Sequence, residues 1–150
     1  MAARNPNSSR PTPARILLVD DNANGLGARK CVLEELGHRI WAVSSAAEAL
    51  EAFAEHKFDL VVTDYKMPRM NGVELIAEIR KQAPECPAIL ISGFVDALGM
   101  SELSTGADVV IQKSAHEVSH LVRSVNRLLR RKPARKSAGS EPSKAKRKAV

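Results

Sequence analysis

Five short apolar runs recur along the chain, each of a length suited to a β-strand. They cover Arg15–Asp20, Arg39–Val43, Phe58–Thr63, Ala88–Ser92 and Asp108–Gln112. Apolar residues follow one another in these runs instead of alternating with polar ones. That pattern is typical of strands buried on both faces of a parallel sheet.

The segments between these strands carry helical periodicity. Apolar side chains recur three and four residues apart over 46–53, 73–79 and 118–129. Residues 22–36 are also predicted to be helical, although Gly25 and Gly27 weaken that segment. Residues 94–105 are poorly patterned, so we expect the least regular or most mobile element there. Strands that alternate with helices predict right-handed βαβ units and a doubly wound (βα)5 α/β sheet.

Length and composition fit one domain. The chain has 150 residues, 44% of them hydrophobic, which is enough for a substantial core. No apolar run approaches the roughly 18 residues of a membrane span, and the N-terminus lacks the apolar centre of a secretory signal. Cys31 and Cys86 lie far apart with no CxxC spacing. This arrangement favours reduced thiols and a cytoplasmic location.

Charge is distributed unevenly along the chain. Of its 23 Lys and Arg residues, nine lie within 130–150, which leaves 14 basic and 16 acidic residues before that stretch. The body is therefore mildly acidic, and the formal net charge of +6 arises from the C-terminal segment. We expect a disordered leader over 1–14, a folded domain over 15–130 and a disordered basic tail over 131–150.

Polar side chains gather at the ends of the predicted strands. In doubly wound sheets ligands bind beyond the carboxyl ends of the strands, where Asp20, Asp21, Asp64, Ser92 and Lys113 would lie. Each close pair of carboxylates would repel by roughly 4 kcal/mol at 4 Å and an effective dielectric of 20. A divalent cation relieves that repulsion, and oxygen ligands without nearby Cys or His favour Mg²⁺.

The same residues suit phosphoryl transfer. A carboxylate such as Asp64 can act as a nucleophile and form an acyl phosphate. Lys113 and Ser92 could bind the phosphoryl oxygens, where charge develops during the transfer.

These motifs together resemble the response-regulator receiver domain, the phosphoacceptor module of two-component signalling. The resemblance covers residues 15–130 and is strongest in four motifs in the family's order: Val19–Asn22, Asp64–Gly72, Ile91–Gly93 and Gln112–Lys113.

The resemblance implies a flavodoxin-like fold with strand order 2-1-3-4-5. It also implies that Asp64 accepts a phosphoryl group from a phosphohistidine on a sensor histidine kinase or a phosphotransfer protein. Mg²⁺ would be held by Asp20, Asp21, Asp64 and the backbone carbonyl of Lys66. Ser92 and Lys113 would report the modification to the surface around the fourth and fifth helices, which binds a downstream protein. Such a stand-alone, chemotaxis-regulator-like module catalyses only its own phosphorylation and dephosphorylation.

Two positions depart from the family pattern. The switch position three residues before Lys113 is usually aromatic but is Val110 here, and the usual proline after the lysine is Ser114. Val110 leaves open a second reading, a pseudo-receiver that binds partners without using phosphorylation. The complete acidic set and Lys113 favour the phosphoacceptor.

One motif competes with this interpretation. Residues 116–120 match the HExxH pattern of zinc peptidases. The apolar stripe of the last helix places both histidines on its outer side, and no third ligand follows at the expected spacing. Ser114 and Glu117 are better explained as a capping box that begins this helix.

The outer side of the last helix is also basic. Arg123, Arg127, Arg130 and Arg131 continue the stripe into the tail. The stripe is either a solvated face or a weak, sequence-blind contact with nucleic acid, anionic lipid or an acidic partner, since no aromatic residue follows Phe94 for base stacking.

Overall fold

The computed structural model describes the backbone of residues 13–139 and the side chains of residues 13–130. Its sheet consists of β1 (Arg15–Val19), β2 (Arg39–Val43), β3 (Leu60–Asp64), β4 (Ala88–Ser92) and β5 (Val109–Gln112). All neighbouring strands are parallel, and their order is β2-β1-β3-β4-β5. The predicted flavodoxin-like sheet and its strand order are confirmed.

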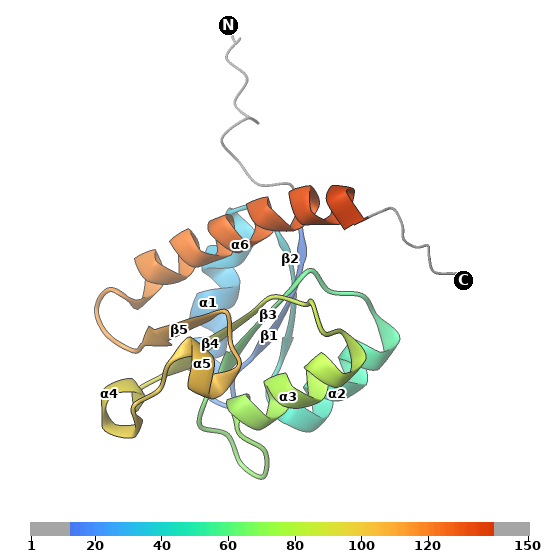
Figure 1. Cartoon of the computed structure of the whole chain (residues 1–150). Helices are drawn as coiled ribbons and strands as arrows, with labels where there is room; N and C mark the ends of the chain where they lie inside the picture. The colour runs from blue at the N-terminus through green and yellow to red at the C-terminus, as the bar shows by residue number, and fades with distance from the viewer. Residues whose placement is uncertain (1–12, 140–150) are drawn as a thin grey trace, which may run out of the picture.

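The helices pack on both faces of this sheet (Figure 1). One face carries α1 (Ala23–Glu35) and α6 (Glu117–Gly139), and the other carries α2 (Ala46–Glu55) and α3 (Gly72–Gln82). Because helices cover both faces of the sheet, its central strands lie in the interior, and every residue of β3 and β4 is buried. The continuous apolar runs in the sequence have this cause.

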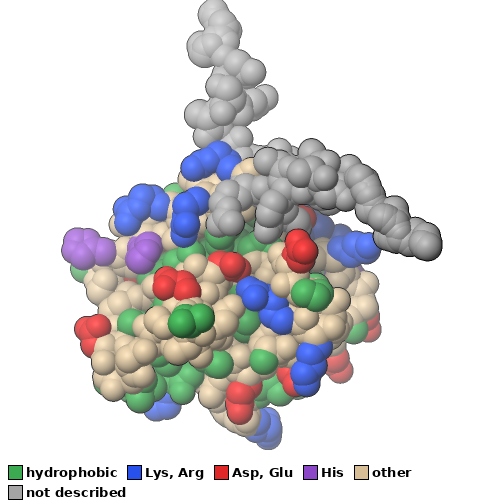
Figure 2. Space-filling model, viewed as in Figure 1, with side chains coloured by type: hydrophobic (Ala, Val, Ile, Leu, Met, Phe, Trp, Pro, Cys, Tyr) green, Lys and Arg blue, Asp and Glu red, His purple; other side chains and the backbone are tan. Residues whose placement is uncertain are grey.

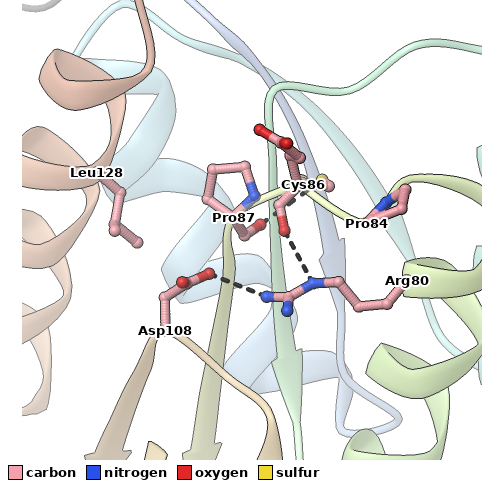
Figure 3. A pocket seen from close by; sticks show the side chains of 7 residues that line it. Arg80, Pro84, Cys86, Pro87, Asp108 and Leu128 are labelled. Atoms are coloured by element: carbon pink, nitrogen blue, oxygen red, sulfur yellow. Dashed lines mark hydrogen bonds and ion pairs between the residues drawn. The ribbon is translucent and has the colours of Figure 1, made fainter. Parts of the chain in front are cut away.

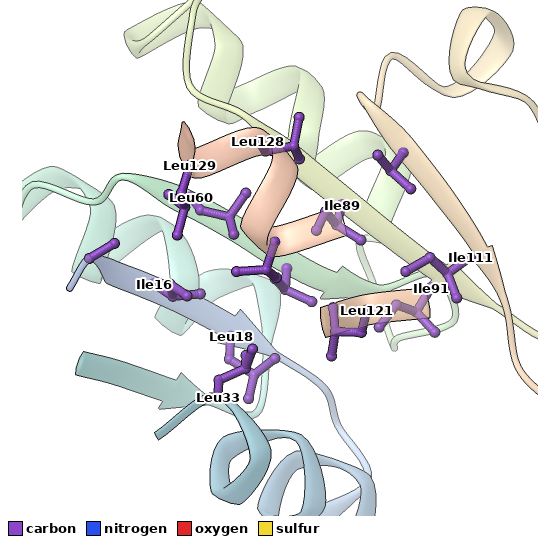
Figure 4. Close-up of a cluster of buried hydrophobic side chains, with 14 residues drawn as sticks. Ile16, Leu18, Leu33, Leu60, Ile89, Ile91, Ile111, Leu121, Leu128 and Leu129 are labelled. Atoms are coloured by element: carbon purple, nitrogen blue, oxygen red, sulfur yellow. The ribbon is translucent and has the colours of Figure 1, made fainter. Parts of the chain in front are cut away.

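The core forms two layers, one on each face of the sheet. Figure 4 shows the layer beneath α1 and α6, where Leu33 and Leu121 meet Leu18, Ile91 and Ile111 from the strands. On the other face, small alanines of α2 and large residues of α3 pack against β1 and β3. Each fully buried Leu or Ile side chain contributes about 1.5–3 kcal/mol relative to an exposed one.

The region between β4 and β5 contains two very short helices, α4 (Val95–Leu98) and α5 (Glu102–Thr105). Each ends at a glycine in the left-handed region, Gly99 with φ 61° and Gly106 with φ 83°. These glycines stop each helix after about one turn. The expected irregularity of this segment is therefore present in the structure.

The ends of the folded unit differ from the predicted boundaries. Ala14, expected in the leader, is buried, and its backbone N–H donates to His38 Nδ1 over 3.0 Å. At the other end α6 continues to Gly139, past the predicted boundary at residue 130, although this stretch contains Pro133, which disfavours a helix interior. The predicted disorder of residues 1–12 and 140–150 lies outside the described residues.

Candidate functional site

Three carboxylates meet at the carboxyl edge of the sheet. Asp64 ends β3, and Asp20 and Asp21 follow the adjacent β1, whose Val19 lies opposite Thr63. Each carboxylate offers an oxygen within 4.8 Å of the oxygens of the other two. Asp20 and Asp64 are only 1% and 3% exposed, whereas Asp21 faces solvent. The cluster is therefore a partly buried concentration of negative charge.

Neither Asp20 nor Asp21 caps the following helix. The side chain of Asn22 performs this role by accepting from the backbone N–H of Gly25 over 3.0 Å. Asp20 Oδ1 instead accepts from the Asn22 N–H over 2.9 Å, which fixes the turn between strand and helix. Helix capping therefore does not explain the acidic pair.

The loop that follows Asp64 passes close to the end of β3. At Gly72 a Cβ atom would collide with the carbonyl oxygen of Asp64 and would lie 2.7 Å from Leu90 Cδ1. Only glycine fits this close approach. A capping box between Asn71 and Glu74 then begins α3, so the loop is held at both ends.

Lys113 and Ser92 complete the site from the next two strands. Lys113 directly follows β5, and its Nζ lies 2.7 Å from Asp64 Oδ1. Ser92 ends β4, is 2% exposed and accepts from the Phe94 N–H through Oγ over 2.9 Å. A backbone hydrogen bond of 2.9 Å from Lys113 N to Ser92 O joins the two residues.

Burial dominates the electrostatics of Asp64. It raises the pKa of this carboxyl above its ordinary value of 3.8, and the neighbouring Asp20 adds to the rise, while Lys113 and Arg29 oppose it. The ammonium of Lys113 lies within hydrogen-bonding distance of Asp64 Oδ1 and favours the ionised carboxylate. The three carboxylates form an all-oxygen donor set, which fits a hard cation such as Mg²⁺.

The site opens into a surface hollow of about 530 Å³. Its lining includes Asp21, Asp64, Lys66, Ser92 and Lys113, so acidic, hydroxyl and ammonium groups face the same space. The hollow is large enough for a phosphoryl group and its donor to approach Asp64.

One residue of the site was missed in the sequence. Arg29 of α1 is 6% exposed, and its guanidinium pairs with both Asp20 and Glu117. The predicted capping box at the start of α6 was wrong: the Glu117 side chain is held by Arg29, while Ser114 Oγ accepts from His116 N.

The HExxH motif is not assembled as a zinc site. Its glutamate, Glu117, accepts from Arg29 Nε over 2.6 Å, and His116 precedes the first residue of α6. Among the residues that the structure describes, the three aspartates form the one cluster suited to a metal ion.

A second hollow, of about 490 Å³, lies at the opposite edge of the sheet, where β4 and β5 begin (Figure 3). Arg80 crosses it and donates to the Cys86 carbonyl oxygen over 3.1 Å and to Asp108 over 3.0 Å. Asp108 also accepts from the Ala88 N–H over 2.8 Å. These groups bind one another, so the hollow has a structural explanation.

Comparisons with known proteins agree with the geometry. Residues 16–126 match the response regulator receiver domain family. The transcriptional regulatory protein GlrR of Escherichia coli is 38% identical over 80 residues, covering 53% of this chain and 18% of GlrR. The probable transcriptional regulator ycf27 of Cyanidium caldarium is 30% identical over 123 residues, covering 80% of this chain and 49% of ycf27. The chain thus spans only about a fifth to a half of these relatives.

Solved structures match over nearly their whole length. A CheY-like receiver domain protein from Methanospirillum hungatei has a TM-score of 0.75 at 28% identity, covering 83% of this chain and 99% of that one. TrrA of Thermotoga maritima, in complex with Mg²⁺–BeF, has a TM-score of 0.67 at 33% identity, covering 76% and 97%. On this evidence the chain belongs to the response regulator receiver domain family.

Proposed function

We propose that this protein is a phosphoacceptor of a two-component phosphorelay and that Asp64 receives the phosphoryl group. The observation that carries the proposal is the position of Asp64 itself. It is buried against two further carboxylates, lies 2.7 Å from a lysine ammonium and faces an open hollow. A nucleophilic carboxylate needs this combination of access and nearby positive charge.

Asp20, Asp21, Asp64 and the backbone carbonyl of Lys66 would hold Mg²⁺. The ion, when bound, would neutralise part of the negative charge on the transferring phosphoryl group. A relative, TrrA of Thermotoga maritima, has been solved in complex with Mg²⁺–BeF. The all-oxygen donor set of the three aspartates supports the assignment for this chain.

The remaining side chains have separable roles in the transfer. An Asp64 oxygen forms the new bond to phosphorus as the bond to the donor's histidine nitrogen breaks. The electron pair of the broken bond returns to that nitrogen, and the imidazole leaves as the neutral ring because its other nitrogen already carries a proton. Lys113 would move from Asp64 Oδ1 to a phosphoryl oxygen, as a compact cation can. Ser92 would donate its hydroxyl to a second oxygen, while its Oγ continues to accept from Phe94 N.

The partner surface in this proposal lies around the fourth and fifth helices expected from the sequence, which the structure has as α4 with α5 and as α6. The first part of this surface lies beside Ser92. Phe94, Leu98 and Leu103 are exposed there, with Leu103 96% exposed. Exposed apolar side chains of this size are typical of contact sites for other proteins. A sensor histidine kinase or a phosphotransfer protein would supply the phosphoryl group, and a downstream protein would bind the altered surface. A cytoplasmic location remains part of the proposal, because the two cysteines lie far apart in the sequence with no CxxC spacing.

The outer face of α6 offers a second contact surface. Figure 2 shows histidine and basic side chains gathered along this helix. Arg123, Arg127 and Arg130 are exposed at helical spacing, and no acidic side chain among the described residues pairs with them. We propose that this face makes a weak electrostatic contact with nucleic acid or an acidic partner. A variant with all three arginines replaced by glutamine should lose the contact, and added salt should weaken it steeply.

The phosphoacceptor proposal is tested with a small acyl-phosphate donor. Wild-type protein incubated with the donor and Mg²⁺ should gain one phosphoryl group by intact mass, and hydroxylamine should remove it. Asp64→Asn should gain none. Asp96→Asn, a change at an exposed aspartate of α4, should behave like wild type. A folded wild-type protein that gains no mass would leave the pseudo-receiver, favoured by Val110, as the better account.

A further inference from the structure

A buried arginine joins the acidic site to the start of α6. Arg29 Nη1 pairs with Asp20 Oδ2, and Arg29 Nε donates to Glu117 Oε2 over 2.6 Å. The side chains of Arg29 and Asp20 are 7% and 1% exposed. A buried charge is tolerated only when it is paired, so each of the three residues depends on the other two.

The first turn of α1 leaves room for this pair. A Cβ atom at position 25 would lie 2.6 Å from Asp20 Oδ2 and 3.5 Å from Arg29 Nη1. Gly25 therefore permits the contact at a helical position where glycine costs about 1 kcal/mol relative to alanine. The glycine that weakened the helix prediction has a specific use here.

Both carboxylate oxygens of Asp20 already have partners. Its Oδ2 faces Arg29, while its Oδ1 accepts from the Asn22 N–H. Burial acts to lower the pKa of Arg29, but the bonds to Glu117 and the charge of Asp20 outweigh it, so the pKa is raised and the cation is permanent. A second cation at the site must share Asp20 with this guanidinium.

We infer that Arg29 is a positioning residue that competes with the divalent cation for Asp20, and that Glu117 moderates the competition by partly neutralising Arg29. This inference rests on the proposed function, because it concerns the same metal site. Without the metal, Arg29 keeps Asp20 in place and reduces the repulsion among the three carboxylates. With the metal, the positive charge of Arg29 opposes binding, and Glu117 reduces that opposition.

Substitutions at Arg29 and at Glu117 should therefore change the Mg²⁺ affinity in opposite directions. Arg29→Met removes a positive charge near the site and should tighten Mg²⁺ binding by about tenfold. Glu117→Gln removes a negative charge behind Arg29 and should weaken Mg²⁺ binding severalfold. Arg29→Lys keeps the charge and should bind Mg²⁺ with an affinity closer to wild type. A purely structural role for the pair predicts no such inversion.

Isothermal titration calorimetry of the full chain with Mg²⁺ tests the inference, with Arg80→Met as the matched control. Arg80 also forms an ion pair, but at the opposite edge of the sheet, so its replacement should leave Mg²⁺ affinity unchanged. If wild type binds Mg²⁺ and Arg29→Met binds it no more tightly than wild type, the inference about Arg29 is overturned and the proposed function still stands. If neither wild type nor any variant binds Mg²⁺, both the inference and the proposed function are overturned. If Arg29→Met does not fold, the direction of the Glu117→Gln effect decides.

Discussion

Replacing Asp64 by asparagine should make the metal-free protein more stable at neutral pH, although the change removes the residue central to the proposed function. Asp20, which offers an oxygen within 4.8 Å, repels Asp64 by about 3.5 kcal/mol at an effective dielectric of 20, and the exposed Asp21 adds less because water screens its charge. Lys113 at 2.7 Å attracts Asp64 by about 6 kcal/mol on the same basis, less a discount because the Lys113 side chain is 40% exposed. Arg29 also attracts Asp64, so these charges together do not account for a raised pKa, and the burial of Asp64 decides the sign.

The raised pKa of Asp64 expresses the same balance. A carboxyl whose folded pKa is raised contributes stability below its unfolded pKa, and the protein loses that contribution as pH rises through the folded pKa. At pH 7 the ionised Asp64 therefore destabilises the fold by about 1.4 kcal/mol for each unit of pKa rise. Asp64→Asn removes this penalty, and its advantage should shrink as pH falls toward 3.8.

Urea denaturation at pH 7 in the presence of a chelator measures the effect. We expect a higher free energy of unfolding for Asp64→Asn than for wild type. The exposed control Asp96→Asn should stay within about 0.5 kcal/mol of wild type. Saturating Mg²⁺ should stabilise wild type by about 2.7 kcal/mol at a hundredfold excess over Kd and Asp64→Asn by less. A less stable Asp64→Asn under metal-free conditions would refute the reasoning.

Two further predictions concern the scaffold around the site. Gly72→Ala should destabilise the fold by about 1–3 kcal/mol, because the added methyl group would collide with the backbone of β3. The control, Gly27→Ala, meets open space in α1 and should stabilise the fold by up to about 1 kcal/mol. Equal effects of the two substitutions in thermal melts would contradict the packing argument. His38→Gln should flatten the pH dependence of stability below 6.5, because burial lowers the pKa of His38 and the wild-type protein loses the stability of its neutral form as pH falls from 6.5 toward that lower value. An unchanged pH profile in urea denaturation would count against this role for His38.

The sheet and the acidic cluster could both be predicted from the sequence. The sheet followed from five continuous apolar runs, and the acidic cluster followed from the rule that ligands bind at the carboxyl ends of parallel strands. The Arg29 network was missed because its partners lie nine and 88 residues away in the chain, and no periodic pattern reports such a pairing. The capping box at Glu117 failed for the same reason, since a distant buried arginine outcompetes a local backbone contact.

The ends of elements were harder to place than the elements themselves. Helix α6 runs to Gly139, past the apolar periodicity that ends at Leu129. Residues 131–139 combine Arg, Lys and Ala, which favour a helix, with Pro133, which disfavours one, so intrinsic propensity did not predict this extension. The division of the segment after β4 into α4 and α5 depends on the left-handed backbone of Gly99, which composition alone does not reveal.

The most direct test of the account is to locate the phosphoryl group after reaction with a small acyl-phosphate donor. Tandem mass spectrometry of the reacted wild-type chain should place the modification at Asp64 and show that it requires Mg²⁺. Asp21→Asn should reduce the yield, because it removes an exposed carboxylate of the metal cluster. Modification at another residue, or at Asp64 with equal yield in a chelator, would contradict the central claim that this acidic site is a magnesium-dependent phosphoacceptor.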